Sequence, residues 1–273
     1  MSGDISKEGP LNDVKRIIGG QKKLSKPDYI SNTRLNFDQQ WVGTLSSLQK
    51  LGLHIDRAVY PNKGETHIHG ENISLSMQYE PIPSDDVPEK ISKYFLEHIP
   101  NHQRESWKVM RSFSVTNSTN NKKLDVMELV LPGYRIFFRP SSGDYARVIH
   151  DNDINVIQIS GDFAQLRTLL SLMHEIGHVH VDKQYDPDMA KKITDIRKVY
   201  TNYSVKLTQN DLQLVVQDEI NAWDFVLKLL QPFINPSAHS FLSEKAIKED
   251  MAYSLKSYWK IIDERLGRAP ISL

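Results

Sequence analysis

Two segments near the C-terminus carry apolar residues at three- and four-residue steps, the period of an amphipathic helix. Between Asp211 and Leu230 these positions are Leu212, Val215, Val216, Ala222, Trp223, Val226 and Leu230. Between about 242 and 266 they are Ala246, Met251, Leu255, Trp259 and Ile262. A third segment, 169–180, begins with an apolar, helix-compatible run. We therefore expect three helices in this part of the chain.

Other segments alternate apolar and polar residues, as half-buried strands do. The clearest is 73–79, and 66–69 is a candidate partner for it. Strand-like runs follow at 126–131 and 134–138, and the runs 145–149 and 154–159 flank a hairpin turn at 151–153. Helical patterns also occur at 38–51, 88–98 and 103–113. The pattern predicts an α+β fold, with a small β-sheet packed on the helix at 169–180.

The distribution of polar residues divides the chain into three parts. Residues 1–33 are polar and are expected to form a mobile tail. Residues 34–144 are expected to form an α/β region of unassigned role, with a polar loop at 117–123. Residues 145–273 contain the hairpin and the predicted C-terminal helices, so we expect them to form the core.

The segment Leu169–His180 contains the motif HExxH, as His174-Glu175-Ile176-Gly177-His178. Residues four apart lie on the same face of a helix, so His174 and His178 can offer two imidazole nitrogens to one metal ion. Glu175 can reach a water molecule on that ion and act as a general base. The alternative is a polar helical turn with two solvated histidines.

A zinc site needs a third protein ligand, and Glu219 is the candidate. It lies in the middle of the apolar stripe of the segment 211–230, where a bare carboxylate is costly to bury. A zinc ion would offset that cost. Two alternatives would also explain a glutamate at this position: a buried ion pair with an Arg or Lys, or a helix that faces solvent there. Asp218 and Asp224 fall off the stripe and are weaker candidates.

These motifs resemble the ImmA/IrrE-like metallopeptidases, a bacterial and phage family of the gluzincin type. The segment 170–178 is similar to the family's helix ending in HELGH. The segment 219–225 is similar to its ExxAxxF motif, and Leu229-Leu230-Gln231-Pro232 matches the two Leu and a Pro that follow it. The chain departs from the family at Val226, where a small residue is usual, and in the longer gap between His178 and Glu219.

The resemblance covers about residues 145–265 and implies a zincin-like fold. It implies Zn²⁺ held by His174, His178 and Glu219, and Glu175 as the catalytic base of an endopeptidase. It also implies limited proteolysis of a regulatory protein, such as a DNA-binding repressor. The alternatives are a metal-bound regulator that binds a partner without cutting it, and a DNA-binding stress regulator.

Composition bears on those alternatives. Lys plus Arg number 34 and Asp plus Glu number 34, so the net charge is zero, which disfavours broad contact with nucleic acid. The chain has no cysteine, which excludes disulfides and thiol chemistry. We see no apolar signal core and no run long enough to span a bilayer, so we expect a cytoplasmic protein with a protein or peptide substrate.

The connection between the two ligand segments has a helical pattern of its own. Asp186 and Pro187 are typical of an N-cap and a first helical position. A narrow apolar stripe follows, made of Met189, Ile193, Ile196 and Tyr200. We predict a short helix over the site that acts as a movable lid. Tyr200 or Tyr203 is then a candidate for stabilising the oxyanion, the alternative being an ordinary surface tyrosine.

Overall fold

The computed structural model describes residues 64–69, 73–85, 87–141, 145–151, 154–234 and 242–267. The predicted tail 1–33 and the predicted helix 38–51 lie outside these residues. The strands are β1 (Gly64–His69), β2 (Ile73–Pro81), β3 (Lys108–Asn117), β4 (Lys122–Asp125), β5 (Tyr134–Pro140), β6 (Tyr145–Asp151) and β7 (Ile154–Gly161). The helices are α3 (Glu89–Glu97), α4 (Leu166–Asp182), α5 (Pro187–Val199), α6 (Gln209–Leu230) and α7 (Glu244–Arg265).

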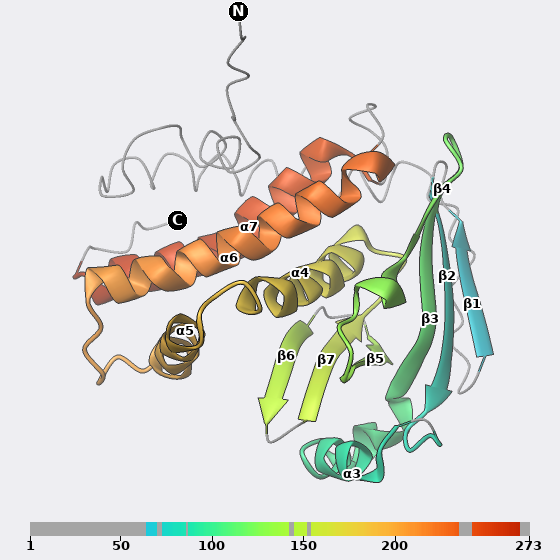
Figure 1. Cartoon of the computed structure of the whole chain (residues 1–273), viewed down its shortest axis with the longest axis horizontal. Coiled ribbons are helices and arrows are strands. Elements are labelled where there is room, and N and C mark those ends of the chain that lie inside the picture. The colour runs from blue at the N-terminus through green and yellow to red at the C-terminus, as the bar shows by residue number, and fades with distance from the viewer. Residues whose placement is uncertain are drawn as a thin grey trace, which may run out of the picture.

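The seven strands form one mixed sheet in the order β1-β2-β3-β5-β7-β6, and β4 pairs with β3 beside that path. The pair β5–β7 is parallel, and the other pairs are antiparallel. The sheet therefore contains strands from both sides of residue 144. Strand β6 ends the strand order on the side of α4 (Figure 1).

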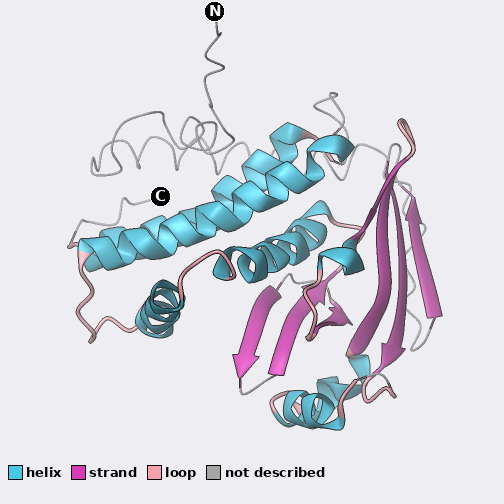
Figure 2. Cartoon of the chain, viewed as in Figure 1, coloured by secondary structure: helices cyan, strands magenta, loops and turns pink. Residues whose placement is uncertain are grey.

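The two faces of the sheet bury different side chains, because neighbouring residues on a strand point to opposite faces. Ile136 and Phe138 on β5 join the larger cluster, which includes α4, α6 and α7. Phe137, between them, joins a smaller cluster with α3, where its ring lies edge-on to Phe95 with centroids 4.4 Å apart. The sheet is thus covered by α3 on one face and by the C-terminal helices on the other (Figure 2).

Helix α4 lies between the sheet and the two long helices α6 and α7 (Figure 1). Such a central helix must be apolar on most sides, and α4 buries residues from Leu166 to Val181 around its circumference. Helix α6 begins with a capping box between Thr208 and Asp211, and α7 begins at the N-cap Ser243. No helix in the described part of the chain is long and apolar enough to cross a membrane.

Most sequence-predicted elements are confirmed: the α+β class, the pairing of 66–69 with 73–79, the strand at 134–138, the hairpin at 145–159, and the helices at 88–98, 169–180, 186–200, 211–230 and 242–266. These elements have a regular apolar period over their whole length. Their local pattern therefore agrees with the face that the fold buries.

The predicted helix at 103–113 is wrong: the chain forms a short 3-10 helix, Asn101–Ser106, and then β3. A register shift causes the error. Gln78 pairs with Ser112 but Tyr79 pairs with Met110, so Arg111 is an extra residue on β3. This bulge places Met110 and Phe113 in the same core at a three-residue step, which imitates a helix.

The strand-like run at 126–131 is also not a strand. Residues Val126–Leu129 form a 3-10 helix, because the side chain of Asp125 accepts a hydrogen bond from the backbone N–H of Met127 and turns the chain. The buried Val126 joins the larger cluster, so its apolar character reflects packing and not strand pairing.

Helices α4 and α6 approach closely at Gly177, inside the HExxH motif. A Cβ atom at Gly177 would lie 2.7 Å from the carbonyl oxygen of Ala222 and 3.3 Å from its Cα. The contact partner is backbone, which cannot move aside as the end of a side chain can. Glycine at 177 and a small residue at 222 therefore set the separation of the two helices.

We expect Gly177→Ala to destabilise the fold by about 1–3 kcal/mol, the usual cost of overpacking a tight core. The added methyl group must push α4 away from α6. Urea unfolding would measure the loss, with Ser171→Ala on the same helix as the matched control. Equal midpoints for Gly177→Ala and the control would contradict the close-packing argument.

Candidate metal centre

Helix α4 presents His174 and His178 on one face, one turn apart. Both histidines are buried, and their Nε2 atoms lie 3.1 Å apart. The ring of His174 also stacks on Trp223 of α6, with centroids 4.5 Å apart and planes 27° from parallel. Packing therefore holds the rings so that both Nε2 atoms face the same point.

Helix α6 adds Glu219, which is 2% exposed. Its Oε2 lies 3.0 Å from Nε2 of His174, and its Oε1 lies 3.4 Å from Nε2 of His178. One ligand atom from each of the three residues falls within 4.8 Å of the others. The structure thus brings together the three residues that the sequence singled out as metal ligands, although they come from two helices.

The spacing fits a metal ion. Ligands at about 2.0–2.1 Å from a tetrahedral zinc ion lie roughly 3.3 Å from one another, close to the distances among these three side chains. A buried carboxylate facing two imidazoles is also the donor set that borderline metals prefer. This buried His-His-Glu group can therefore bind a metal ion.

Glu175 differs from the three ligands because it is only partly buried. Its negative charge raises the pKa of Tyr145 on β6, where burial is the larger cause, and it also contributes to the raised pKa of Tyr258 on α7. Glu175 is therefore near enough to interact electrostatically with a tyrosine on β6 and with one on α7, and its side chain keeps some contact with solvent.

Two residues at the centre were missed or undervalued by the sequence reasoning. Asp218 was expected to lie off the buried stripe, but it is 1% exposed. Its Oδ2 lies 3.4 Å from Nδ1 of His178. Arg197 of α5 donates hydrogen bonds to both Asp218 and Glu219. The ion pair that the sequence offered as an alternative for Glu219 therefore exists beside the ligand cluster. The sequence could have indicated Arg197 by its position next to Ile196, at the edge of the apolar stripe of α5.

The charged residues at the centre shift one another's pKa values. Burial alone would lower the pKa of His178, but the negative charges of Glu219 and Asp218 outweigh it and raise the pKa from 6.5 to about 10. Burial would raise the pKa of Glu219 and of Asp218, yet His178 and Arg197 lower both, that of Glu219 well below its usual range. Without a metal ion these shifts favour ionised acids and a protonated His178.

Comparison of the chain with protein-family models, with curated proteins and with solved structures finds no match. The geometry of the centre and the motifs themselves therefore carry the functional argument.

The two tyrosines proposed for the oxyanion are held elsewhere. The phenol of Tyr200 donates to the backbone carbonyl of Tyr258, at 3.1 Å. Tyr203 is 55% exposed and hydrogen-bonds to Glu264. Burial raises the pKa of the Tyr258 phenol, and the negative charges of Glu219 and Glu175 raise it further. Tyr258 lies three residues after Leu255 and four before Ile262, so it belongs to the apolar stripe already visible in the sequence.

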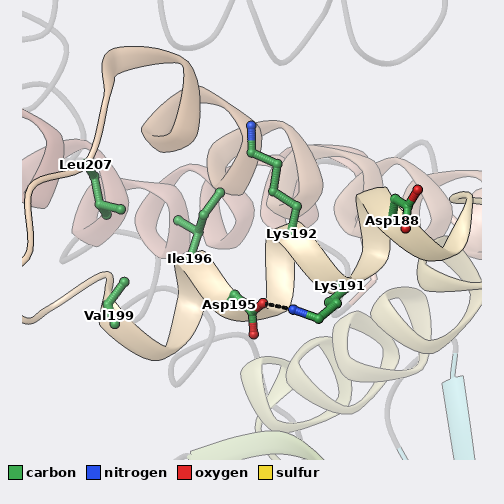
Figure 3. A pocket seen from close by; sticks show the side chains of 7 residues that line it. All are labelled: Asp188, Lys191, Lys192, Asp195, Ile196, Val199 and Leu207. Atoms are coloured by element: carbon green, nitrogen blue, oxygen red, sulfur yellow. Dashed lines mark hydrogen bonds and ion pairs between the residues drawn. The ribbon is translucent and has the colours of Figure 1, made fainter.

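The predicted helix between the ligand segments is confirmed as α5, with Asp186 as its N-cap and Pro187 as its first residue. Ile193, Ile196 and Tyr200 are buried, as the stripe predicted. The movement that would make α5 a lid stays a prediction. The outer side of α5 carries a shallow depression lined by Asp188, Lys191, Lys192, Asp195, Ile196, Val199 and Leu207, none of which belongs to the ligand cluster (Figure 3).

The raised pKa of His178 predicts how metal-free stability depends on pH. A proton held more tightly in the folded state stabilises it fully below pH 6.5, and this stabilisation is lost as pH rises through about 10. Asp218 and Glu219 have lowered pKa values in the folded state, so the stability that they contribute is lost only in acid, as the pH falls through those values. We expect the stability of the chelator-treated protein to fall between pH 6.5 and 10.

Urea unfolding of the chelator-treated protein across this range measures the slope. His178→Gln should give a flatter profile because the titrating group is gone, and His180→Gln on the same helix is the matched control. Parallel profiles for wild type and His178→Gln would contradict the assignment.

Proposed function

We propose that the protein is a zinc-dependent endopeptidase of the ImmA/IrrE-like type with a zincin-like fold. The observation that supports this most is the buried group of His174, His178 and Glu219, at zinc-ligand spacing, beside the partly exposed Glu175. A purely structural zinc site is usually closed by four protein ligands, whereas catalytic sites keep an open position. Three protein ligands and an adjacent carboxylate fit the catalytic kind.

A bound zinc ion would polarise the peptide carbonyl and make its water ligand more acidic. Glu175 would accept the proton of that water and later pass it to the leaving amine. Tyr258, on the opposite helix, would donate a hydrogen bond to the oxygen that becomes negative during attack. His174, His178 and Glu219 would hold the ion, and Trp223 would fix the ring of His174 by stacking.

The substrate is proposed to be an extended segment of a protein. Strand β6 ends the order of the described sheet, and its first residue, Tyr145, is close enough to Glu175 to sense its charge. An extended peptide added to this edge would lie across the centre. By the family resemblance, the partner would be a regulatory protein, such as a DNA-binding repressor, cut at a limited number of bonds in the cytoplasm.

Glu175→Gln should keep the fold and the bound zinc but lose hydrolysis by about 10²–10⁴-fold, because shape is preserved and the base is removed. The assay is cleavage of a proteome-derived peptide library, read by mass spectrometry, with zinc content measured in parallel. Glu97→Gln, on the exposed surface of α3, is the control. Undiminished cleavage by Glu175→Gln would rule out the mechanism, and zinc binding by a wild type without cleavage would favour the non-hydrolytic regulator.

Tyr258→Phe should lower kcat by about 10²–10³-fold while leaving zinc content unchanged, because it removes one hydrogen-bond donor to the developing oxyanion. Tyr203→Phe is the matched control and should cleave like wild type, since its phenol bonds to Glu264 at the surface. The same peptide assay applies. Equal rates for the two variants would remove Tyr258 from the mechanism.

A further inference from the structure

One basic side chain contacts both buried acids of the centre. Nη2 of Arg197 lies 2.6 Å from Oε1 of Glu219 and also donates to Oδ2 of Asp218. Arg197 comes from α5, whereas both acids are on α6. The contact therefore links the connection between the ligand helices to the ligand cluster itself.

The first consequence concerns the orientation of Glu219. Arg197 holds Oε1, so the other oxygen, Oε2, is the one that lies 3.0 Å from Nε2 of His174. The same Oε1 lies 3.4 Å from Nε2 of His178, so each histidine faces a different oxygen of Glu219. A carboxylate with one oxygen fixed by a hydrogen bond loses little rotational freedom when it binds a metal ion. Arg197 thus fixes the plane of the Glu219 carboxylate relative to the two histidines.

The second consequence concerns His178. Its Nδ1 lies 3.4 Å from Oδ2 of Asp218, the oxygen that Arg197 also contacts. A carboxylate behind a ligand histidine fixes the orientation of the ring and turns the opposite nitrogen toward the metal. Through Asp218, Arg197 therefore acts on a second ligand as well.

Helix α5, which carries Arg197, is itself held in place by contacts with α7 and with the core. The guanidinium of Arg265 on α7 donates to four backbone carbonyls after or at the end of α5, those of Val199, Tyr200, Asn202 and Val205, at 2.7–2.8 Å. Buried Ile193 and Ile196 add apolar contact with the core. These contacts hold α5 in place between α7 and the ligand cluster.

We propose that Arg197 is a positioning residue for the metal ligands Glu219 and His178, so that metal affinity depends on the docking of α5. This inference rests on the proposed metal centre.

An opposing effect must be weighed, because a guanidinium repels a metal cation. Asp218 is not one of the three ligands, and its negative charge balances that of Arg197. Removing Arg197 would leave Asp218 and Glu219 as adjacent buried carboxylates, which repel each other and turn away from their present positions. The loss of ligand orientation therefore outweighs the relief of repulsion.

The test is zinc affinity of the full chain, measured by competition with a chromophoric chelator. Arg197→Ala should bind zinc about 10–100-fold more weakly than wild type, the usual effect of removing such a supporting partner. Lys198→Ala is the matched control, because its side chain is 70% exposed and forms its ion pair with Asp195, away from the ligand cluster. It should bind zinc like wild type.

Two further readouts separate positioning from general loss of structure. Arg197→Lys keeps the charge but not the planar fork, so it should recover part of the affinity. The visible absorption of the Co²⁺-loaded protein reports ligand geometry; it should change in Arg197→Ala and be unchanged in Lys198→Ala. If Arg197→Ala does not fold, an intermediate affinity and altered Co²⁺ spectrum of Arg197→Lys support the proposal, and wild-type values for that variant overturn it.

The outcomes distinguish this inference from the proposed function. Zinc affinity of Arg197→Ala equal to or tighter than that of wild type overturns the positioning role and leaves the peptidase proposal standing. A wild-type chain that binds no zinc overturns both. Wild type that binds zinc but cleaves nothing overturns the peptidase proposal alone, because the affinity comparison is independent of hydrolysis.

Discussion

The burial of Asp218 and Glu219 is the constraint on which the centre depends. Two adjacent carboxylates with almost no solvent contact are unstable in a protein core unless positive charge lies beside them. His178, whose pKa is raised to about 10, and Arg197 supply that charge, and they come from α4 and α5, which both pack against α6. Helices α4, α5 and α6 must therefore dock together for any one of them to be stable in place.

Close packing between the backbones of α4 and α6 also requires these two helices to dock together. Gly177 lets α4 approach the carbonyl of Ala222, which brings the histidines of one helix within hydrogen-bond distance of the carboxylate of the other. The sheet fixes α4 from the opposite side and ends in β6, next to Glu175. The ligand cluster is thus enclosed by packed helices, which the sheet holds in turn from the other side of α4.

Arg265, near the end of the described chain, connects α7 to α5. Its guanidinium donates to backbone carbonyls at and after the end of α5, among them those of Val199 and Tyr200. Helix α7 thereby supports α5, contributes Tyr258 to the surroundings of Glu219, and packs on the same core as α4 and α6. This segment, which the sequence predicted only as an amphipathic helix, thus contributes both to the support of α5 and to the surroundings of Glu219.

The sequence by itself determined the long helices, the hairpin β6–β7 and the three residues of the ligand cluster. Each has a signal within one element: a regular apolar period, a turn between strands, or a polar residue at a fixed step in an apolar stripe. The tertiary structure decided the rest. The bulge at Arg111 gives β3 a helix-like apolar period, and pairing with β2 makes this segment a strand in spite of it. Asp218, Arg197 and Tyr258 surround Glu219 through the packing of helices α5, α6 and α7, which are separate in the sequence. Their contacts depend on helix crossing and on charge balance in the core, which no local pattern encodes.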